Sequence, residues 1–253
     1  MKLSACIISF NEADRIAACC DSLRFCDEIL VVDSHSTDGT REVAMAHGAR
    51  VIERDWTGYR SQRHFAAEQS SNDWILSIDA DERVSALLRA ELEALRNSEF
   101  TGIVGASVPT LTHYLGKFLR HGNAWPDRHV RLFNRQQVRW GGYEVHEKLD
   151  YSGNIVKLAG WLEHYSYRNF TEHLAKRDRY AKLMSEQMYQ AGKRAFALQI
   201  VLNPLLRFLK GMIVKLGVLD GWRGLVFHLV EADYVRRKYL GLWLLIRKRK
   251  SGN

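Results

Sequence analysis

Two carboxylates stand one residue apart in Asp79-Ala80-Asp81, directly after the apolar run Trp74–Ile78. A short apolar run of this kind is typical of a buried strand, so both acids are expected at the end of a strand. Carboxylates this close repel each other unless a cation lies beside them. A hard divalent cation such as Mg²⁺ or Mn²⁺, shared with substrate phosphates, would serve. We therefore predict Asp79 and Asp81 as metal ligands, and a solvated turn with helix-capping acids is the plainer interpretation.

Polar residues also follow two earlier apolar runs. Leu3–Phe10 is followed by Asn11, which is predicted to cap a helix, and Glu28–Val32 ends at Asp33. Segments of helical character separate the strand-like runs, and they are Ile16–Leu23, Glu42–His47, Gly58–Gln69 and Ser85–Arg96. Strands and helices that alternate in this way form a parallel sheet, and ligands bind beyond the carboxyl ends of its strands. Asn11, Asp33 and Asp79–Asp81 should therefore share one edge of the sheet.

The charge of the chain changes sign along its length. Residues 1–100 carry 11 Lys and Arg against 18 Asp and Glu, a net charge of −7, and residues 101–253 carry 26 against 11, a net charge of +15. The first part has the composition of an acidic α/β unit, and the second is expected to meet an anionic partner. No DNA- or RNA-binding motif accompanies the basic residues, so we expect no nucleic-acid partner.

Cysteine usage indicates a reducing compartment. The four cysteines, at positions 6, 19, 20 and 26, form no C-x-x-C pair and have no zinc-binding spacing, so they are expected to be buried thiols. The apolar stretch Ala5–Phe10 is interrupted by Asn11-Glu12 before it reaches the length of a signal peptide's apolar region. We expect a protein of the cytoplasm or of the cytoplasmic face of a membrane.

The C-terminal region is expected to be amphipathic rather than membrane-spanning. Its most apolar stretch, Ala197–Leu219, contains three cations and a proline, and each central charge costs roughly 2.5–3.5 kcal/mol on insertion into a bilayer. The tail Tyr239–Lys250 joins six large apolar residues to the basic cluster Arg247–Lys250. This pattern favours an interfacial helix on anionic lipid. A helical lid on the core, with a frayed basic end, is the alternative.

Three segments at the predicted strand ends resemble the N-terminal motifs of family 2 glycosyltransferases, which are inverting enzymes of the GT-A fold. The segments are Leu3–Glu12 (LSACIISFNE), Glu28–Thr40 (EILVVDSHSTDGT) and Trp74–Arg83 (WILSIDADER). Further segments are similar to a bacterial subgroup that glycosylates the inner core of lipopolysaccharide or lipooligosaccharide, typically as β-1,4-glucosyltransferases acting on a core heptose. Those segments are Trp56–Arg63, Pro126–Asn134, Trp140–Leu149, Leu162–Tyr167 and Leu219–Gly221. The similarity covers most of the chain.

This resemblance implies a nucleotide-sugar site at the ends of the first strands. Ser9, Asn11 and Glu12 match positions near the nucleotide. Asp33 matches the acid that contacts the base or ribose, and uracil offers an N–H donor that a carboxylate can accept. A turn that caps the following helix is a further role for the loop after Asp33.

The same resemblance implies a metal-bridged diphosphate. Asp79 matches the position that touches ribose or metal, and Asp81 matches the principal ligand of the metal. Arg131 is a candidate for the diphosphate because guanidinium groups match phosphate oxygens, and Arg63 is a candidate for the donor side. A solvated surface position is the plainer interpretation of both arginines.

Inversion at the anomeric carbon requires in-line attack by an acceptor hydroxyl, a base that takes its proton and a cation that holds the departing diphosphate. The base is expected to be a carboxylate downstream of the Asp-x-Asp triplet. Glu147 is the first candidate, and Asp127 and Glu144 are the alternatives. A surface salt bridge with Lys148 is the plainer interpretation of Glu147.

Other functional classes fit the sequence less well. A phosphatase of the haloacid dehalogenase type would need Thr or Val at the position of Arg83, and a dinucleotide-binding enzyme would need a G-x-G-x-x-G motif, which is missing. Residues 136–140 spell Q-x-x-R-W, a motif of processive synthases, but it precedes the candidate base Glu147 instead of following it. A membrane-surface adaptor with a degenerate transferase fold remains the non-enzymatic alternative.

We therefore predict an α/β protein of the GT-A type, with a mostly parallel central sheet, flanking helices and a basic amphipathic helical C-terminal region. Residues 1–167 would form the glycosyltransferase domain, with a nucleotide-sugar half at about 1–100 and an acceptor half at about 101–167, and residues 168–253 the helical region. The predicted reaction moves a sugar, most simply glucose from UDP-glucose, to a lipid-anchored core oligosaccharide, with another UDP-sugar and cell-envelope acceptor as the alternative. The predicted location is the inner face of the cytoplasmic membrane, on its anionic surface.

Overall fold

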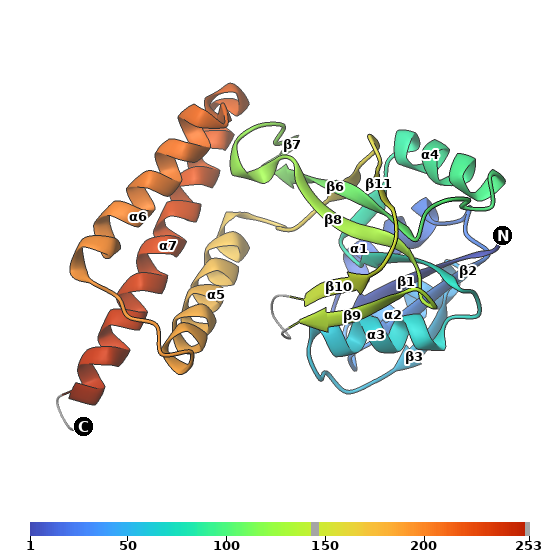
Figure 1. Ribbon diagram of the computed structural model, residues 1–253, viewed down its shortest axis with the longest axis horizontal. Coiled ribbons are helices and arrows are strands. Elements are labelled where there is room, and N and C mark those ends of the chain that lie inside the picture. Colours follow the sequence, from blue (N-terminus) through green and yellow to red (C-terminus); the bar gives the residue numbers. More distant parts are fainter. Residues whose placement is uncertain (143–146, 251–253) are drawn as a thin grey trace. The chain divides into compact units, whose positions relative to one another are not determined.

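A computed structural model describes residues 1–142 and 147–250, apart from the side chains of residues 139–142, 147–149, 249 and 250. The chain divides into two compact units. Unit 1 comprises residues 1–110 and 128–164, and unit 2 comprises residues 111–127 and 165–253. Figure 1 labels the helices and strands of both units.

Unit 1 is built on a mixed sheet whose strands follow the order β3-β2-β1-β4-β8-β6-β12-β5. The first four neighbours are parallel, and they are β3 (Arg50–Glu53), β2 (Glu28–Asp33), β1 (Leu3–Ser9) and β4 (Trp74–Asp79). Four helices connect or flank these strands: α1 (Ala13–Ser22), α2 (Thr40–Ala46), α3 (Tyr59–Gln69) and α4 (Ala86–Asn97). The predicted alternation of parallel strands and helices is confirmed.

The rest of the sheet returns in the opposite direction. β8 (Asp127–Asn134) is antiparallel to β4, and β12 (Leu162–His164) is antiparallel to β5 (Glu82–Val84). The remaining strands are β6 (Gly105–Tyr114), its parallel partner β11 (Ile155–Lys157), and the separate antiparallel pair β9 (Val138–Gly142) and β10 (Glu147–Tyr151). These returning strands make the sheet mixed, and β12 brings residues far from the Asp-x-Asp triplet next to it.

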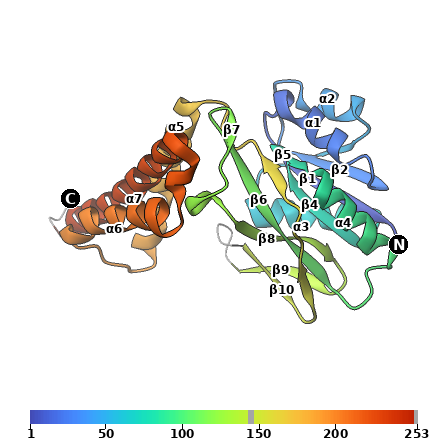
Figure 2. The ribbon, with the colours of Figure 1, turned by 90° about the horizontal axis from the view of Figure 1, so that it is seen from above.

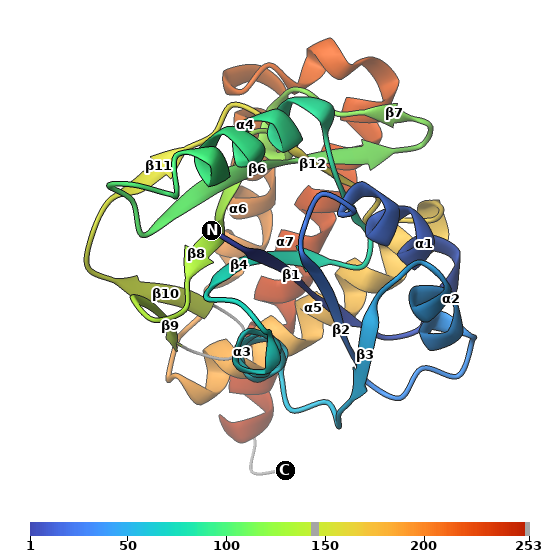
Figure 3. The ribbon, with the colours of Figure 1, turned by 90° about the vertical axis from the view of Figure 1, so that its right-hand side faces the viewer.

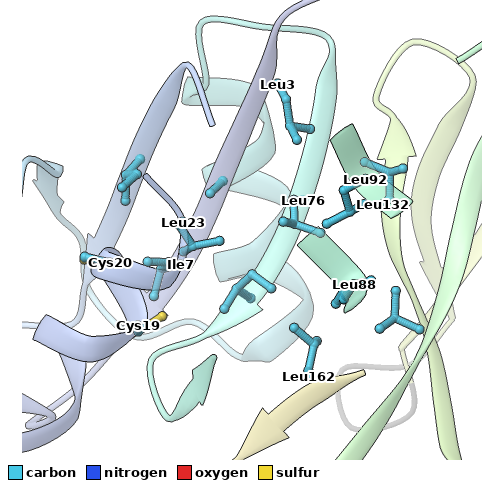
Figure 4. Close-up of a cluster of buried hydrophobic side chains, with 14 of the residues drawn as sticks. Leu3, Ile7, Cys19, Cys20, Leu23, Leu76, Leu88, Leu92, Leu132 and Leu162 are labelled. Carbon is cyan, nitrogen blue, oxygen red and sulfur yellow. The ribbon is translucent and has the colours of Figure 1, made fainter. Parts of the chain in front are cut away.

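Both faces of the parallel strands are buried, because successive side chains point to opposite sides of a strand. Leu3 and Ile7 of β1 face α1, α2 and α4, and Cys6 faces α3. Figure 3 shows α3 on the opposite side of these strands from α1 and α2. Figure 4 shows the larger cluster, in which Leu88 and Leu92 of α4 lie near Leu76 and Leu132.

Unit 2 consists of helices and the segment 111–127. Its elements are β7 (Lys117–Phe118), which pairs with the end of β6, η1 (Gly122–Ala124), α5 (Phe170–Gln190), α6 (Ala197–Leu209), η2 (Lys210–Val214), η3 (Gly217–Asp220) and α7 (Gly221–Lys250). α5 and α6 both pack along α7 (Figure 2). Asn169 caps α5, because its side-chain oxygen accepts a hydrogen bond from the Glu172 N–H at 2.8 Å. α5 therefore begins at the start of the region 168–253 that the sequence predicts as helical.

Segment 111–127 is joined to the helices by the buried side chain of Asp220 in η3. Its carboxylate accepts hydrogen bonds from the backbone N–H groups of Arg120 at 3.1 Å and His121 at 2.9 Å. The division into units thus places segment 111–127 and residues 165–167 with the helices, whereas the predicted boundary lies at residue 167. Backbone groups about a hundred residues away in sequence satisfy Asp220, and no local pattern signals such a contact.

One local prediction is wrong. Asn11 does not cap α1; Glu12 occupies that position, and it makes no side-chain capping bond. Asn11 has a left-handed backbone with φ of 54°. The α1 N-terminus is instead capped by the loop after β2, where Thr40 Oγ1 accepts from the Glu12 N–H at 2.8 Å and Asp38 from the Ala13 N–H at 3.1 Å.

Candidate active site

The carboxyl ends of β1, β2 and β4 meet at one edge, as the sequence predicts. Ser9 pairs with Asp33 in the β1–β2 ladder, and Ile8 pairs with Asp79 in the β1–β4 ladder. Ser9, Asp33 and Asp79 therefore end their strands at the same level. Such an edge of a doubly wound sheet is where ligands bind.

Asp33 is fully buried and organises the loop that follows it. Its carboxylate accepts hydrogen bonds from Ser9 Oγ at 2.7 Å, Ser36 Oγ at 2.6 Å and the Ser36 N–H at 2.7 Å. A carboxylate offers about four acceptor positions, so these bonds leave about one for an N–H or O–H of a ligand. Ser9 and Asp33 thus lie together, and the Ser9 hydroxyl donates its hydrogen bond to Asp33.

Asn11 binds the other side of the same loop. Its backbone N–H donates to Ser36 Oγ at 2.8 Å, and its side-chain oxygen accepts from the Thr37 N–H at 2.9 Å. Glu12 lies next to it, and its carboxylate is 3.4 Å from the guanidinium group of Arg15. Asn11 and Glu12 therefore lie at the predicted edge, where they fix the loop between β2 and α2.

Asp79 lies between two arginines. Arg63 donates to its Oδ1 at 2.7 Å, and Arg131 donates to its Oδ2 at 3.3 Å. Burial on its own would raise the pKa of Asp79, but the two guanidinium groups outweigh it and hold that pKa well below the usual range. The structure thus brings together Asp79, Arg63 and Arg131, three residues predicted separately for this site.

Glu82 completes this cluster, and the sequence analysis did not select it. It is fully buried, accepts from the Asp79 N–H at 2.9 Å and accepts from Arg131 at 2.5 Å. Burial and the nearby charge of Asp79 raise its pKa, although Arg131 opposes the shift. Its position directly after the Asp-x-Asp triplet is the signal that could have identified it.

Asp81 faces an imidazole and a buried arginine. His164 Nε2 lies 3.2 Å from Asp81 Oδ2, and the guanidinium group of Arg15 lies 3.7 Å from the same oxygen. Burial would lower the pKa of His164, but the carboxylates of Asp81, Glu82 and Asp79 raise it. His164 reaches this place because it pairs with Glu82 in the β12–β5 ladder. It lies in one of the segments that carry the family resemblance, but the sequence did not indicate its role.

Asp81 and His164 could both ligate a divalent cation, one through oxygen and one through nitrogen. Among residues 1–142 and 147–250, no group of three or more metal-binding side chains lies close enough to hold an ion by itself. Mg²⁺ and Mn²⁺ sites of this class take one or two protein ligands and complete the shell with water and substrate phosphates. The residues present therefore fit a cation that is shared with a diphosphate. Asp79 itself is bound by the two arginines.

The candidate bases are less fully described. Asp127 begins β8 and is exposed. Glu147 begins β10, and its side chain lies outside the described part of the chain, as does the whole of Glu144. The choice among Glu147, Asp127 and Glu144 stays a prediction. Neighbouring Arg128 donates to the Leu158 carbonyl oxygen at 2.8 Å, which fixes β8 beside the segment before β12.

Comparison with known proteins decides the family. Residues 4–150 match the model of glycosyl transferase family 2. The chain belongs to this family. The lipopolysaccharide core biosynthesis glycosyltransferase LpsC of Rhizobium meliloti is 34% identical over 218 residues, which cover 83% of this chain and 80% of the relative. The uncharacterised glycosyltransferase RP128 of Rickettsia prowazekii is 29% identical over 242 residues, covering 91% of this chain and 83% of the relative.

A solved structure supports the fold assignment. The mannosyltransferase PcManGT of Pyrobaculum calidifontis, solved with GDP-Man and Mn²⁺, superposes with a TM-score of 0.55 at 15% identity, covering 96% of this chain and 87% of the other. At this identity the likeness concerns the fold alone. The family 2 chain is thus a glycosyltransferase with a GT-A fold.

Proposed function

We propose that this glycosyltransferase moves glucose from UDP-glucose to a heptose of the lipopolysaccharide or lipooligosaccharide inner core, with inversion at the anomeric carbon. The resemblance of several segments to inner-core glucosyltransferases supports this acceptor. The relative LpsC, a lipopolysaccharide core biosynthesis glycosyltransferase, supports the same class of acceptor. The choice of glucose rests on the resemblance alone.

The observation that carries the proposal is the charge arrangement at the strand-end edge. Arg63 and Arg131 supply fixed positive charge at Asp79, and Asp81 with His164 offers a partial ligand shell to a cation. A nucleoside diphosphate brings phosphate oxygens that would complete the shell of such a cation and that guanidinium groups can bind. Asp33 and its loop, at the end of neighbouring β2, are then placed for the base or ribose.

The chemistry is a single displacement. The acceptor hydroxyl attacks the anomeric carbon as the bond to the diphosphate breaks, and a carboxylate of the chain takes the hydroxyl proton. We propose Glu147 for this base, with Asp127 as the alternative. A divalent cation bound at Asp81 would neutralise charge on the departing diphosphate. The arginines at Asp79 stay in place throughout, and they position that carboxylate for ribose or metal.

We also propose that the enzyme acts at the inner face of the cytoplasmic membrane, where a lipid-anchored acceptor would be found. The net charge of +15 over residues 101–253 supports an anionic surface as a partner. In the tail first considered for membrane contact, Leu244 is 52% exposed, whereas Leu242 of α7 is fully buried within the protein. Its side chain is therefore engaged in packing.

Thermal unfolding with UDP, GDP, CDP and ADP, each with and without Mn²⁺, tests the donor. A ligand at 100 times its dissociation constant adds roughly 2.7 kcal/mol of stability. A shift with UDP that needs Mn²⁺ is the expected result, followed by transfer from UDP-glucose to a purified heptose-terminated core. A shift with another nucleotide would mean that the donor carries that nucleotide instead of UDP. Transfer from a different UDP-sugar would mean that the transferred sugar is not glucose.

A further inference from the structure

The outward face of α6 is apolar. Leu198, Val201, Leu202, Leu205 and Leu209 recur at helical spacing, and each leaves 38–66% of its surface exposed. In the described chain, 15 of the 26 large apolar residues with this degree of exposure fall between positions 196 and 229. One segment of unit 2 therefore holds most of the exposed apolar surface, and a monomeric soluble protein rarely leaves so large a patch uncovered.

The face of α6 that turns toward the rest of unit 2 carries polar residues as well as apolar ones. Two polar residues, Gln199 and Asn203, are half-buried there beside the apolar residues Ile200, Pro204 and Phe208, and Arg207 reaches to 3.6 Å from the buried carboxylate of Glu231 in α7. Apolar residues therefore lie on both sides of α6, whereas the exposed side of a helix in a water-soluble bundle is polar. By length and composition alone, residues 197–214 are also apolar enough to cross a membrane. The Arg207–Glu231 pair and the packing on α7 instead hold α6 in the bundle, which suits a helix lying in the plane of an interface.

A basic groove adjoins this apolar face. A cavity of about 500 Å³ opens beside α6 and α7, and its lining includes Arg207, Lys210, Lys238, Tyr234 and Tyr239. Burial and the charge of Arg207 lower the pKa of Lys238. Three cations gathered in one groove gain from an anion between them, and tyrosines are enriched at membrane interfaces.

We propose that the α6 face, defined as Leu198, Val201, Leu202, Leu205 and Leu209 with the groove at Lys210 and Lys238, lies on an anionic phospholipid bilayer. The leucines and valine would enter the acyl boundary while the groove takes headgroup phosphates. This inference rests on the membrane location proposed above and assigns it to a particular surface.

The charge of unit 2 favours a bilayer over a second copy of the chain as the cover of this face. Unit 2 carries 20 Lys and Arg against 7 Asp and Glu, a net charge of +13. Two such units facing each other through α6 would repel, whereas an anionic lipid surface attracts them. Charge and exposed apolar surface therefore point to the same partner.

Flotation with vesicles of phosphatidylglycerol and phosphatidylcholine tests the inference, with the full chain and no donor or acceptor present. The wild type should float, and the double variant Leu202→Gln, Leu209→Gln should lose at least tenfold in partition coefficient. The matched control is Leu174→Gln, Leu183→Gln on α5, because these leucines are equally exposed at 39% each, against 41% and 38%. The control should stay within twofold of the wild type.

A second pair of variants tests the groove. The double variant Lys210→Gln, Lys238→Gln should weaken binding to anionic vesicles by tenfold or more. The control double variant, Lys117→Gln, Lys157→Gln, removes the same charge elsewhere. The logarithm of its partition coefficient should change by less than a third as much. Equal effects of test and control variants would overturn the inference. So would a wild type that does not float, or a wild type that forms a dimer which the α6 leucine variant converts to a monomer.

Sugar transfer to a water-soluble, deacylated core fragment should be retained by the leucine variants, so the two proposals fail separately.

Discussion

At the scale of single residues, Asp81 is the side chain on which a metal-assisted reaction would depend most. Asp81→Asn keeps the size but removes the charge that would ligate a cation. Loss of about 3 kcal/mol of transition-state stabilisation, or roughly 100-fold or more in turnover, is expected. Steady-state transfer and the Mn²⁺-dependent thermal shift with UDP should fall together. Glu93→Gln, on the exposed side of α4, is the control and should change neither.

The assignment of the base calls for a paired comparison. Glu147→Gln should abolish transfer and leave the thermal shift with UDP and Mn²⁺ intact, because the base acts on the acceptor and not on the nucleotide. Asp127→Asn should leave most turnover in place. Near-normal turnover of the Glu147 variant together with an inactive Asp127 variant would reverse the two roles.

Arg131 and Glu82 form a buried ion pair whose separation should be costly. Glu82 is fully buried and Arg131 is 7% exposed. Arg131→Met leaves the Glu82 carboxylate buried without its closest cation, which costs about 3–5 kcal/mol in comparable cases. Urea unfolding measures the loss. Arg24→Met breaks an exposed pair with Asp21 and should have a far smaller effect; an equal effect would show that the buried pair is not special.

The residues that were predicted and those that were missed differ in where their partners come from. Asp33, Asp79 and Asp81 follow apolar runs directly, so their place at the strand ends can be read locally. His164 depends on a non-local pairing, because β12 lies about 80 residues beyond β5. The sequence shows Glu82 only as a third acid after Asp79 and Asp81, because its partner Arg131 lies on the distant strand β8. A single sequence carries no signal for such pairings.

At the scale of elements, the sequence predicted whether a segment is a helix or a strand better than it predicted how a helix is capped. Parallel strands and their helices were predicted because burial on both faces gives continuous apolar runs. The cap of α1 was missed because it comes from another loop: Thr40 and Asp38 bind the N–H groups of Glu12 and Ala13. Capping rules assume that the cap precedes the helix in sequence, and here the loop after β2 replaces it.

Two glycines of α7 offer a matched test of close packing. A Cβ at Gly224 would lie 2.2 Å from the backbone carbonyl oxygen of Gly217, whereas a Cβ at Gly241 would meet the side chain of Ser185 at 2.9 Å. Alanine favours a helix over glycine by about 1 kcal/mol. Gly224→Ala should nevertheless destabilise unit 2 by about 1–3 kcal/mol, because backbone must move. Gly241→Ala should stay within about 1 kcal/mol of the wild type. Thermal unfolding followed by helical circular dichroism compares the two, and equal losses would contradict the packing.

At the scale of the whole molecule, charge separates the two units as the sequence suggested. The acidic N-terminal part forms the edge where β1, β2 and β4 end, and the basic part forms most of unit 2. What could not be predicted is that segment 111–127 belongs to the helical unit, where the backbone N–H groups of Arg120 and His121 donate to the Asp220 carboxylate. The outward apolar face of α6 was also missed, because periodicity shows that a helix has an apolar stripe and does not show which way the stripe points.

Unit 2 should lose stability as the pH falls, since it contains buried titratable groups whose pKa values are lowered. His173 and His228 are buried at 0% and 2% exposure, and burial lowers the pKa of both. Burial would raise the pKa of Glu231, but the imidazole of His173, whose Nε2 lies 3.8 Å from its Oε1, and the charges of Arg177 and Arg207 lower it. All three groups therefore bind protons more readily in the unfolded chain than in the folded one.

The sign of the pH dependence follows from this difference. A group that binds protons more readily when unfolded makes stability rise with pH, so acid favours unfolding. The histidines act first, as pH falls below about 6.5, and Glu231 acts below about 4.3. His228 also faces Asp220, Arg207 and Lys215, and their charges oppose one another at the imidazole. The melting temperature of unit 2 should thus decline steadily from about pH 7 to about pH 4.

The variant His228→Gln keeps a polar side chain between the glycines of η2 and η3 and removes the proton site. Its melting temperature should change less than that of the wild type between about pH 7 and about pH 5, where only the histidines titrate. The slope is the readout, because a loss of stability that is constant with pH leaves it unchanged. His64→Gln, at a half-exposed position on α3, is the control and should keep the wild-type slope. Parallel slopes for all three proteins would mean that His228 does not gain its proton on unfolding.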